Sequence, residues 1–168
     1  MKKLLFIILF LFLVSIKVEA ADINWAADAS SSKSGSTTGT VHNNPSYSFD
    51  ENENTPYGSD SNFVDCITLV ESDFAITVTI TELKLSYFTL NVGSYAIETY
   101  YSGGWHTAAS GSTVNGVKTT IDFADLNLLG VSKVKATVSD PLTEWSDSDI
   151  YEFYAYGHTA GGSYVFMM

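Results

Sequence analysis

Apolar and polar side chains alternate along most of the chain, and this pattern constrains the fold more than any other feature of the sequence. Across residues 74–80, for example, Phe, Ile, Val and Ile alternate with Ala, Thr and Thr. A period of two residues predicts a half-buried β-strand. No segment has a helical period, and Asp125–Leu129 forms one short helical turn at most. The predicted strands cover residues 74–80, 83–87, 95–100, 105–107, 117–123, 134–138 and 150–156, with a last edge strand at 163–168.

The spacing of these strands predicts the fold class. Eight or so short strands separated by turns rich in Gly, Asn and Ser are typical of an all-β domain, either a β-sandwich or a jelly roll. The apolar positions change parity between Ile80 and Leu83. Because a one-residue shift turns every later side chain to the other face, this change predicts a bulge or a tight turn at Thr81-Glu82.

Residues 24–62 are rich in Ser, Asn, Gly, Thr and Asp, a composition that also occurs in disordered segments. Large apolar residues interrupt the stretch, however, and favour an ordered, loop-rich region that packs against the core. These residues are Trp25, Val41, Tyr47, Phe49, Tyr57 and, just beyond it, Phe63.

The first 20 residues have the pattern of a secretory signal peptide. Lys2 and Lys3 precede the apolar run 4–14, and Val18-Glu19-Ala20 places small residues where a signal peptidase cuts. Eleven apolar residues are too few for a membrane-spanning helix, which needs about 20. We therefore expect cleavage near Ala20, the alternative being an uncut anchor. The remaining 21–168 form one predicted domain without a membrane span.

The charge of the chain excludes several classes of partner. Eight lysines, no arginine and 19 acidic residues give a formal net charge of −11. Residues 1–20 hold three of the lysines and one glutamate, so the mature chain has a net charge of −13. Nucleic acids and anionic membranes are contacted mainly through Lys and Arg, which argues against both as partners. A cation or a neutral sugar remains compatible with this charge.

The single cysteine, Cys66, cannot form an intramolecular disulfide. It lies in the strand-like run 64–69, which favours a buried, inert thiol over a reactive one. An exported chain without disulfides depends on its core, or on a bound metal, for stability.

Four segments together resemble a known family. They are Asn24–Ser31, Tyr47–Tyr57, Ser94–Trp105 with its Tyr-Ala-Ile-Glu and Gly-Gly-Trp motifs, and Ile150–Gly157 with its Ile-Tyr-Glu-Phe core. In order and spacing they resemble the coagulation factor V/VIII type C (discoidin) domains and the related galactose-type carbohydrate-binding modules. The resemblance implies a galactose-binding-like jelly roll. It also implies a structural calcium ion where the first loop meets the last strand.

The sequence departs from the family pattern at three points. Glu51 stands where the family has a glycine after the aspartate, a position whose backbone conformation is often costly for other residues. Tyr57 replaces a tryptophan. The arginines that many sugar-binding members use are missing.

Six consecutive oxygen-bearing side chains at residues 50–55 support the cation independently of the family. Calcium takes six to eight oxygen ligands from carboxylates, amides and carbonyls. The resemblance assigns the calcium ligands to Asp50, Asn52, Thr55 and Glu152, with Asn52 and Thr55 acting through backbone oxygens. The alternative is a solvated acidic turn without a metal. The spacing is not that of an EF-hand.

The sequence leaves open which face of its strand carries the Glu152 side chain. On the same face as Ile150 and Tyr154 it would be a buried carboxylate, which is costly unless paired or metal-bound. Alternatively this face is the outer one, and Tyr151 and Phe153 point inward.

Sugar recognition usually combines an aromatic ring with a few polar groups. Of the rings on predicted loops, Tyr57 and Trp145 are the better ligand candidates, and Trp105 matches a core position of the family. Packing is the alternative for each of them. The other candidates are Trp25, Tyr101 and His106.

The sequence gives little support for catalysis. His42, His106 and His158 lie in no zinc-protease motif, and no nucleophile elbow, C-x-x-C, P-loop or G-x-G-x-x-G is present. We therefore predict an exported, non-catalytic binding module whose ligand is a carbohydrate or cell-surface glycan. The alternative is a structural or surface-assembly protein that uses the same domain for protein contacts, and a small secreted hydrolase is a weaker third hypothesis.

Overall fold

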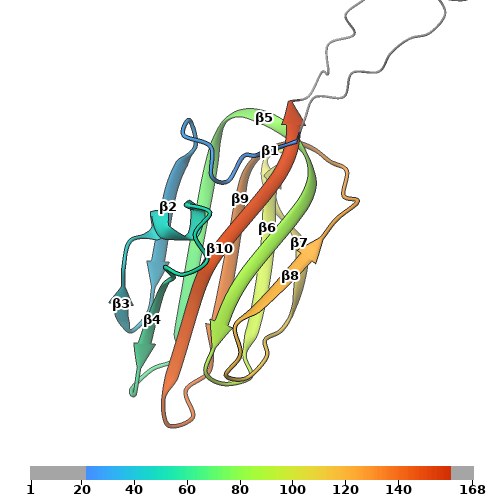
Figure 1. Ribbon diagram of the computed structural model, residues 1–168. Helices are drawn as coiled ribbons and strands as arrows, with labels where there is room; N and C mark the ends of the chain where they lie inside the picture. The colour runs from blue at the N-terminus through green and yellow to red at the C-terminus, as the bar shows by residue number, and fades with distance from the viewer. Residues whose placement is uncertain (1–21, 160–168) are drawn as a thin grey trace, which may run out of the picture.

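The computed structural model describes residues 22–159, whose regular secondary structure is almost entirely β-strand (Figure 1). Within this range no helix is long and apolar enough to cross a membrane. The predicted signal peptide and the predicted edge strand at 163–168 lie outside the described residues. The strands are β1 (Ile23–Asn24), β2 (Ser32–Thr37), β3 (Thr40–His42), β4 (Tyr57–Ser61), β5 (Cys66–Thr89), β6 (Ser94–Tyr101), β7 (Gly104–Ser112), β8 (Thr119–Phe123), β9 (Leu128–Asp140) and β10 (Ser146–Thr159).

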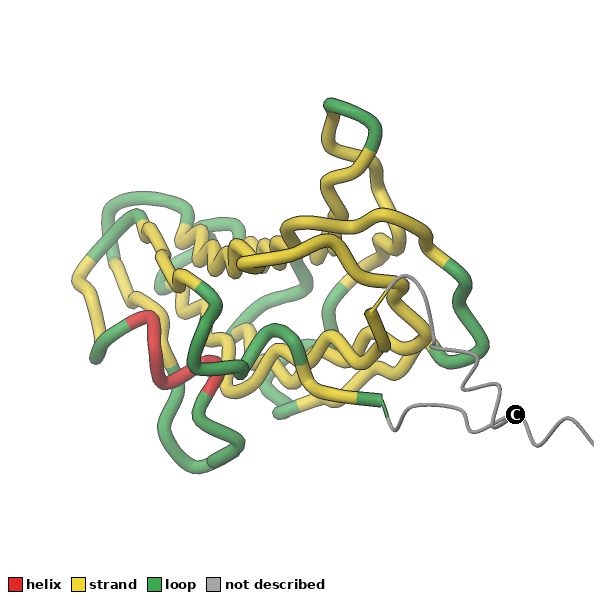
Figure 2. The backbone as a smooth tube through the Cα atoms, turned by 90° about the horizontal axis from the view of Figure 1, so that it is seen from above, coloured by secondary structure: helices red, strands yellow, loops and turns green. Residues whose placement is uncertain are grey.

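The 24-residue strand β5 belongs to both layers of the molecule. Its first half, Cys66–Asp73, pairs with β2 and β9, and β6 and β7 extend this layer. Its second half, Val78–Thr89, pairs with β10 and β8, and β4 and β3 extend the other layer. Regular pairing with β9 is interrupted between Asp73 and Val78, where the strand folds over. All pairs of strands are antiparallel, and the two layers face each other (Figure 2). The predicted all-β sandwich is confirmed.

The core lies between the two layers and consists mainly of branched aliphatic side chains. Fully burying one such side chain stabilises the fold by roughly 1.5–3 kcal/mol. Outside two bulges, the core residues alternate along the strands as the sequence predicts. The core includes Val70, Val78, Ile80, Leu83, Leu85, Ile97, Val134, Ala136, Val138, Ile150 and Phe153.

The predicted parity change at Thr81-Glu82 is confirmed as a β-bulge. Tyr156 of β10 pairs with Glu82, and the next residue, Gly157, pairs with Ile80, so Thr81 is the extra residue. The bulge lets Ile80 and Leu83 both face the core, where each is fully buried.

Several burial expectations from the sequence are wrong. Ile76, expected inside, is 46% exposed because β5 folds over at that point. Phe63, Val41 and Tyr47, all expected to pack against the core, are 83%, 56% and 39% exposed. The one helical turn that the sequence allows at most at Asp125–Leu129 does not form, since Asp125 has a left-handed φ of 58° and β9 begins at Leu128. The helix that is present, the 3₁₀ helix η1 (Pro45–Phe49), follows its capping residue Asn44 and starts at a proline.

Cys66 is fully buried, as predicted. Its Sγ accepts a hydrogen bond from Ser146 Oγ at 3.2 Å, between the start of β5 and the start of β10. A thiol in this position packs as a small core residue.

Candidate functional site

The loop after η1, residues 50–56, folds over strand β10 and brings the four predicted calcium ligands together. Asp50 Oδ1 accepts a hydrogen bond from the Asn52 amide at 2.9 Å. Thr55 Oγ1 donates to Asn52 O at 3.3 Å and lies 3.4 Å from Asp50 Oδ2. The same Asn52 amide also donates to Glu152 Oε1, at 3.1 Å. Carboxylate, hydroxyl and backbone oxygens thus converge on one side of β10.

Glu152 is fully buried beneath this loop, and one of its oxygens is unsatisfied. Oε2 is enclosed and has no hydrogen-bond partner within the described residues. Burial, reinforced by the neighbouring Asp50 carboxyl, raises the pKa of Glu152 to about 8. Two carboxyl groups so close together cannot both carry a charge at low cost, and a cation between them would remove that cost.

A second β-bulge, in β10, decides which way Glu152 faces. Ile150 pairs with Tyr87 and Glu152 pairs with Ser86, so Tyr151 is an extra residue in the strand. As a result Ile150 and Phe153 both point into the core, while Glu152 lies on the outer side under the loop. The sequence offered two alternatives, with either Ile150 and Glu152 or Tyr151 and Phe153 facing inward, and the bulge makes both incorrect.

Glu51, which stands where the family has glycine, adopts the left-handed conformation with φ 60°. Its carboxylate accepts a hydrogen bond from Asn24 Nδ2 at 3.2 Å. The loop therefore keeps a glycine-like backbone despite the side chain, at a cost of about 1 kcal/mol. The Glu53 carboxylate pairs with Lys118 Nζ at 3.1 Å.

The donors of this loop fit a calcium ion. They are all oxygens, they come from carboxylates and backbone as well as a hydroxyl, and they include the unsatisfied Oε2 of Glu152. Calcium prefers this donor set, whereas softer metals prefer nitrogen or sulfur.

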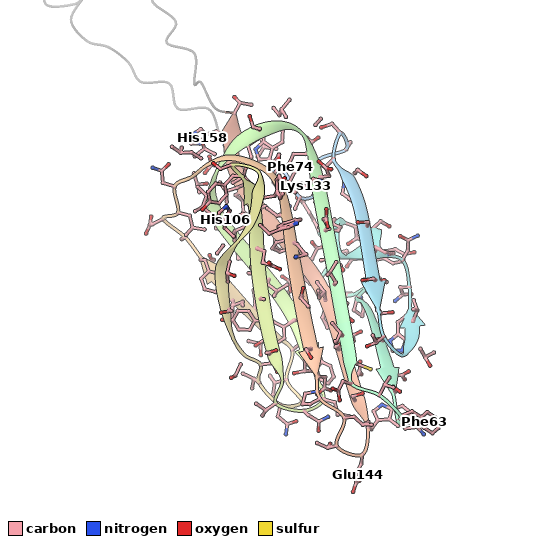
Figure 3. The ribbon with its side chains drawn as sticks, turned by 180° about the vertical axis from the view of Figure 1, so that it is seen from behind. Phe63, Phe74, His106, Lys133, Glu144 and His158 are labelled. Atoms are coloured by element: carbon pink, nitrogen blue, oxygen red, sulfur yellow. The ribbon has the colours of Figure 1, made fainter. Side chains whose placement is uncertain are left out.

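The two predicted sugar-binding rings lie in different environments. Tyr57 is 3% exposed and pairs with Ile150 in the sheet, so its ring has no free face and we leave it out of the candidate ligand surface. Trp145 is 44% exposed in the loop between β9 and β10. Phe63, which the sequence assigned to the core, extends from the β4–β5 loop at the same end of the sandwich, near Glu144 (Figure 3).

Hydrogen bonds hold these two loops and the β5–β6 turn together. Leu142 N donates to Asp65 Oδ1 at 2.7 Å, and Asn91 Nδ2 donates to Trp145 O at 2.8 Å. Asp140, fully buried, accepts hydrogen bonds from the amides of Asn91 and Asp147. The exposed rings are thus carried on a cross-braced set of loops.

The remaining ring candidates are placed elsewhere. Trp25 is buried, and its Nε1 donates to Gly157 O at 3.0 Å. Trp105, expected in the core, is only half-buried and lies under Lys135, whose Nζ is 4.3 Å from the ring centre. Tyr101 and His106 stack on each other with ring centres 4.1 Å apart.

No protein-family profile matches the sequence, and no curated protein is similar to it. Solved structures do resemble the fold. A family 32 module of Clostridium perfringens in complex with GlcNAc-α-1,4-galactose has a TM-score of 0.61 at 18% identity, covering 85% of this chain and 99% of that one. The chitosan-binding module 1 of a Paenibacillus chitosanase/glucanase gives 0.58 at 19% identity, covering 80% and 99%. The galactose-bound family 32 module of C. perfringens NanJ gives 0.55 at 16%, covering 81% and 98%.

Proposed function

From the galactose-binding-like jelly-roll fold that this chain shares with family 32 carbohydrate-binding modules, we propose that it is an exported, non-catalytic module that binds carbohydrate. The observation that carries the proposal is the exposed ring of Trp145 on the braced loops at one end of the sandwich. An aromatic ring stacks on the apolar face of a sugar, and nearby polar groups bind its hydroxyls.

Polar groups lie next to Trp145. Thr143 is exposed on the same loop, Asn91 is half-buried on the β5–β6 turn, and Thr143 Oγ1 donates to Asn91 Oδ1 at 2.9 Å. Because Asn91 also donates to the backbone oxygen of Trp145, the backbone that carries the ring is held in place without a ligand. Pre-ordered loops lower the entropic cost of binding. Phe63 provides a second exposed ring at this end.

A structural calcium ion is part of the proposal. Asp50, Asn52, Thr55 and Glu152 would hold it, and the ion would supply positive charge to a pair of close carboxylates. In that role it ties the loop 50–56 to strand β10. Asp50 and Glu152 contribute carboxylates, and Asn52 and Thr55 contribute mainly backbone oxygens.

Export is the third part, and it rests on the pattern of residues 1–20. Expression with these residues should give a secreted product that begins at Ala21. Mass spectrometry of the exported protein checks this, and an intact N-terminus up to Ala20 would contradict cleavage.

A glycan array with the protein of residues 21–168, in calcium and in chelator, tests the sugar-binding proposal. Galactose-terminated glycans and chitosan oligosaccharides belong on it, because the similar structures bind them. Calorimetry then quantifies any ligand found. The Trp145→Ala variant should weaken binding about tenfold or more, which corresponds to roughly 1.4 kcal/mol for one stacked ring.

The matched control is Tyr47→Ala, which removes a ring of similar exposure on η1. It should bind like the wild type. A wild type that binds no glycan, or a Trp145→Ala variant of unchanged affinity, would contradict the proposal. A dimer that dissociates on Trp145→Ala would instead support the assembly hypothesis.

A further inference from the structure

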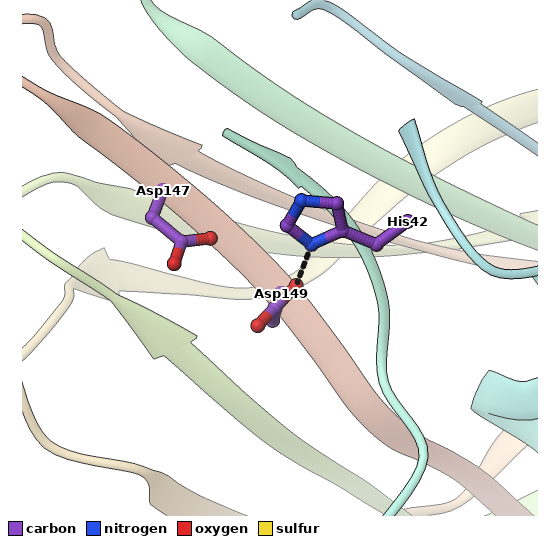
Figure 4. Close-up of side chains that lie close together, drawn as sticks. All are labelled: His42, Asp147 and Asp149. Atoms are coloured by element: carbon purple, nitrogen blue, oxygen red, sulfur yellow. Dashed lines mark ion pairs between the residues drawn. The ribbon is translucent and has the colours of Figure 1, made fainter. Parts of the chain in front are cut away.

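A second cluster of ionisable side chains lies on the outer face of the sheet, where β3, β4 and β10 run side by side. His42 ends β3, Asp60 lies on β4, and Asp147 and Asp149 lie on β10. The register explains their meeting: Asp60 pairs with Asp147, and Gly58 pairs with both His42 and Asp149. His42, Asp147 and Asp149 each offer one ligand atom, and these atoms lie within 4.8 Å of one another (Figure 4).

The carboxylates of this cluster are buried without adequate partners. Asp149 is 7% exposed, and its Oδ1 has no hydrogen-bond partner within residues 22–159. The enclosed Oδ1 of Asp147 has none either. The nearest basic atom, His42 Nδ1, is 3.8 Å from Asp149 Oδ1, which is too far for a hydrogen bond. Enclosing two carboxylates in this way is costly unless a positive charge joins them.

No lysine of the described chain supplies that charge. Lys84, Lys118, Lys133 and Lys135 pair with carboxylates elsewhere on the surface. Lys33 donates to the backbone oxygen of Asp28 at 2.8 Å. Within residues 22–159, His42 is therefore the one basic side chain that pairs with the carboxylates of this cluster.

Gly58 makes the space into which the Asp149 carboxylate points. A Cβ atom at Gly58 would overlap Asp149 Oδ1 and Ser148 O. The backbone of β4 therefore lies directly against the carboxylate, and any larger residue at this position would push it out of the cluster. Glycine in the middle of a strand weakens the strand and often marks a close approach of this kind.

We propose that His42, Asp147 and Asp149 bind a divalent transition-metal ion, with zinc as the expected occupant. An imidazole nitrogen combined with carboxylate oxygens suits zinc and its neighbours, whereas calcium and magnesium prefer oxygen alone. Zinc–ligand bonds of about 2.0–2.2 Å require the three donor atoms to approach one another by roughly 1 Å. His42 keeps about a third of its side chain exposed and can make that movement.

Asp60 completes the arrangement as a positioning residue. Its Oδ1 lies 3.5 Å from His42 Nε2, on the opposite side of the ring from Asp149. When the other nitrogen, Nδ1, binds the metal, Nε2 carries the ring hydrogen and donates a hydrogen bond to Asp60. A carboxylate behind a metal-bound histidine fixes the orientation of the ring and raises its basicity. Three protein ligands leave at least one position for water or for an exogenous ligand. The ion would also fasten the three-residue edge strand β3 to β10.

Calorimetry of metal-stripped protein, residues 21–168, with zinc chloride tests the proposal. One ion per chain should bind at this cluster. His42→Gln and Asp149→Asn should each weaken zinc binding by more than about a hundredfold, and Asp60→Asn by about 10- to 100-fold. The visible spectrum of bound Co²⁺ should change in all three variants, because each alters the coordination or the orientation of the ring.

Two controls separate this site from others. His106→Gln removes a histidine that stacks on Tyr101 away from the cluster, and Glu152→Gln removes the proposed calcium ligand; both should leave zinc affinity unchanged. If Asp149→Asn does not fold, the partly exposed His42→Gln variant carries the test. The proposal is overturned if the wild type binds no zinc, if His42→Gln binds it equally well, or if calcium displaces zinc from the cluster at equal concentration.

Discussion

The loop 50–56 over Glu152, which we propose binds calcium and call the calcium loop, and the His42 cluster around Asp149 use the same strand and the same kind of group. Glu152 and Asp149 both lie on β10, and each has a buried carboxylate oxygen without a hydrogen-bond partner. Their neighbours differ. A loop of oxygen donors closes over Glu152, whereas an imidazole and a second aspartate stand beside Asp149. In both proposals a buried carboxylate oxygen without a hydrogen-bond partner marks the cation site, and the neighbouring donor atoms select the ion.

The two regions also differ in how the chain builds them. The calcium loop is nearly contiguous, since residues 50–55 supply all but one of the proposed ligands. The His42 cluster draws single residues from three strands and depends on their register. We expect calcium removal to release one loop, and zinc removal to release the edge strand β3.

Removal of calcium should give the largest effect. A ligand present at a hundredfold excess over its Kd stabilises the folded state by about 2.7 kcal/mol. For a domain of this size, chelation should lower the melting temperature by roughly 5–10 °C. Differential scanning fluorimetry in calcium and in EGTA measures the difference.

Variants of the two carboxylates sharpen this result. Glu152→Gln and Asp50→Ala should abolish most of the calcium response, and Asp149→Asn should keep it in full. Magnesium should substitute poorly, because it requires a smaller and stricter octahedron. An unchanged melting temperature in EGTA would mean that residues 50–55 are a solvated acidic turn.

In metal-free protein, the Asp149→Asn substitution should stabilise the fold by about 1–2 kcal/mol. It removes a buried charge that lacks a partner while preserving the shape of the side chain. Urea denaturation in EDTA measures the change in the free energy of unfolding. Asp60→Asn, at a more exposed position, should change it by less than about 0.5 kcal/mol. A destabilised Asp149→Asn protein would show that the carboxylate is well paired in the absence of metal.

The smallest effect is expected at Glu51. Glycine adopts the left-handed conformation found there without steric cost, so Glu51→Gly should stabilise the protein by about 0.5–1 kcal/mol and keep the calcium response. Glu53→Gly, at a residue without a positive φ, should not stabilise it. Thermal denaturation of both variants measures the two effects. Equal effects would contradict the claim that the left-handed backbone of Glu51 costs stability.

Much of the fold is predictable because burial follows alternation along each strand. Even the bulge at Thr81 leaves a trace, since Ile80 and Leu83 are apolar and their spacing breaks the period. The bulge at Tyr151 leaves none. Its neighbours Ile150, Phe153 and Tyr154 are all apolar or aromatic, so the side chains do not reveal which of them faces the core.

The sites were predictable to different degrees for a similar reason. Residues 50–55 form a local motif that is visible in the sequence, and the resemblance to a family adds Glu152 as the distant ligand. His42 belongs to a short strand in a turn-rich region, and its partners lie at the other end of the chain; only the alternating aspartates at 147 and 149 were a signal. An aromatic residue can lie in the core or on the surface. The sequence favoured both Tyr57 and Trp145 as surface rings and assigned Phe63 to the core, and the three-dimensional structure exposes Trp145 and Phe63 but buries Tyr57.

Strand β5 contributes hydrogen bonds to both layers, and this has a consequence for how the molecule opens. Detaching either layer exposes backbone groups of the same continuous strand, so local opening of one layer weakens the other. Amide hydrogens in the two halves of β5 should therefore exchange with solvent at similar, slow rates, through one shared opening event. Fast exchange in one half alone would show two independently unfolding units. We therefore expect the sandwich to unfold as one cooperative unit rather than as two independent sheets.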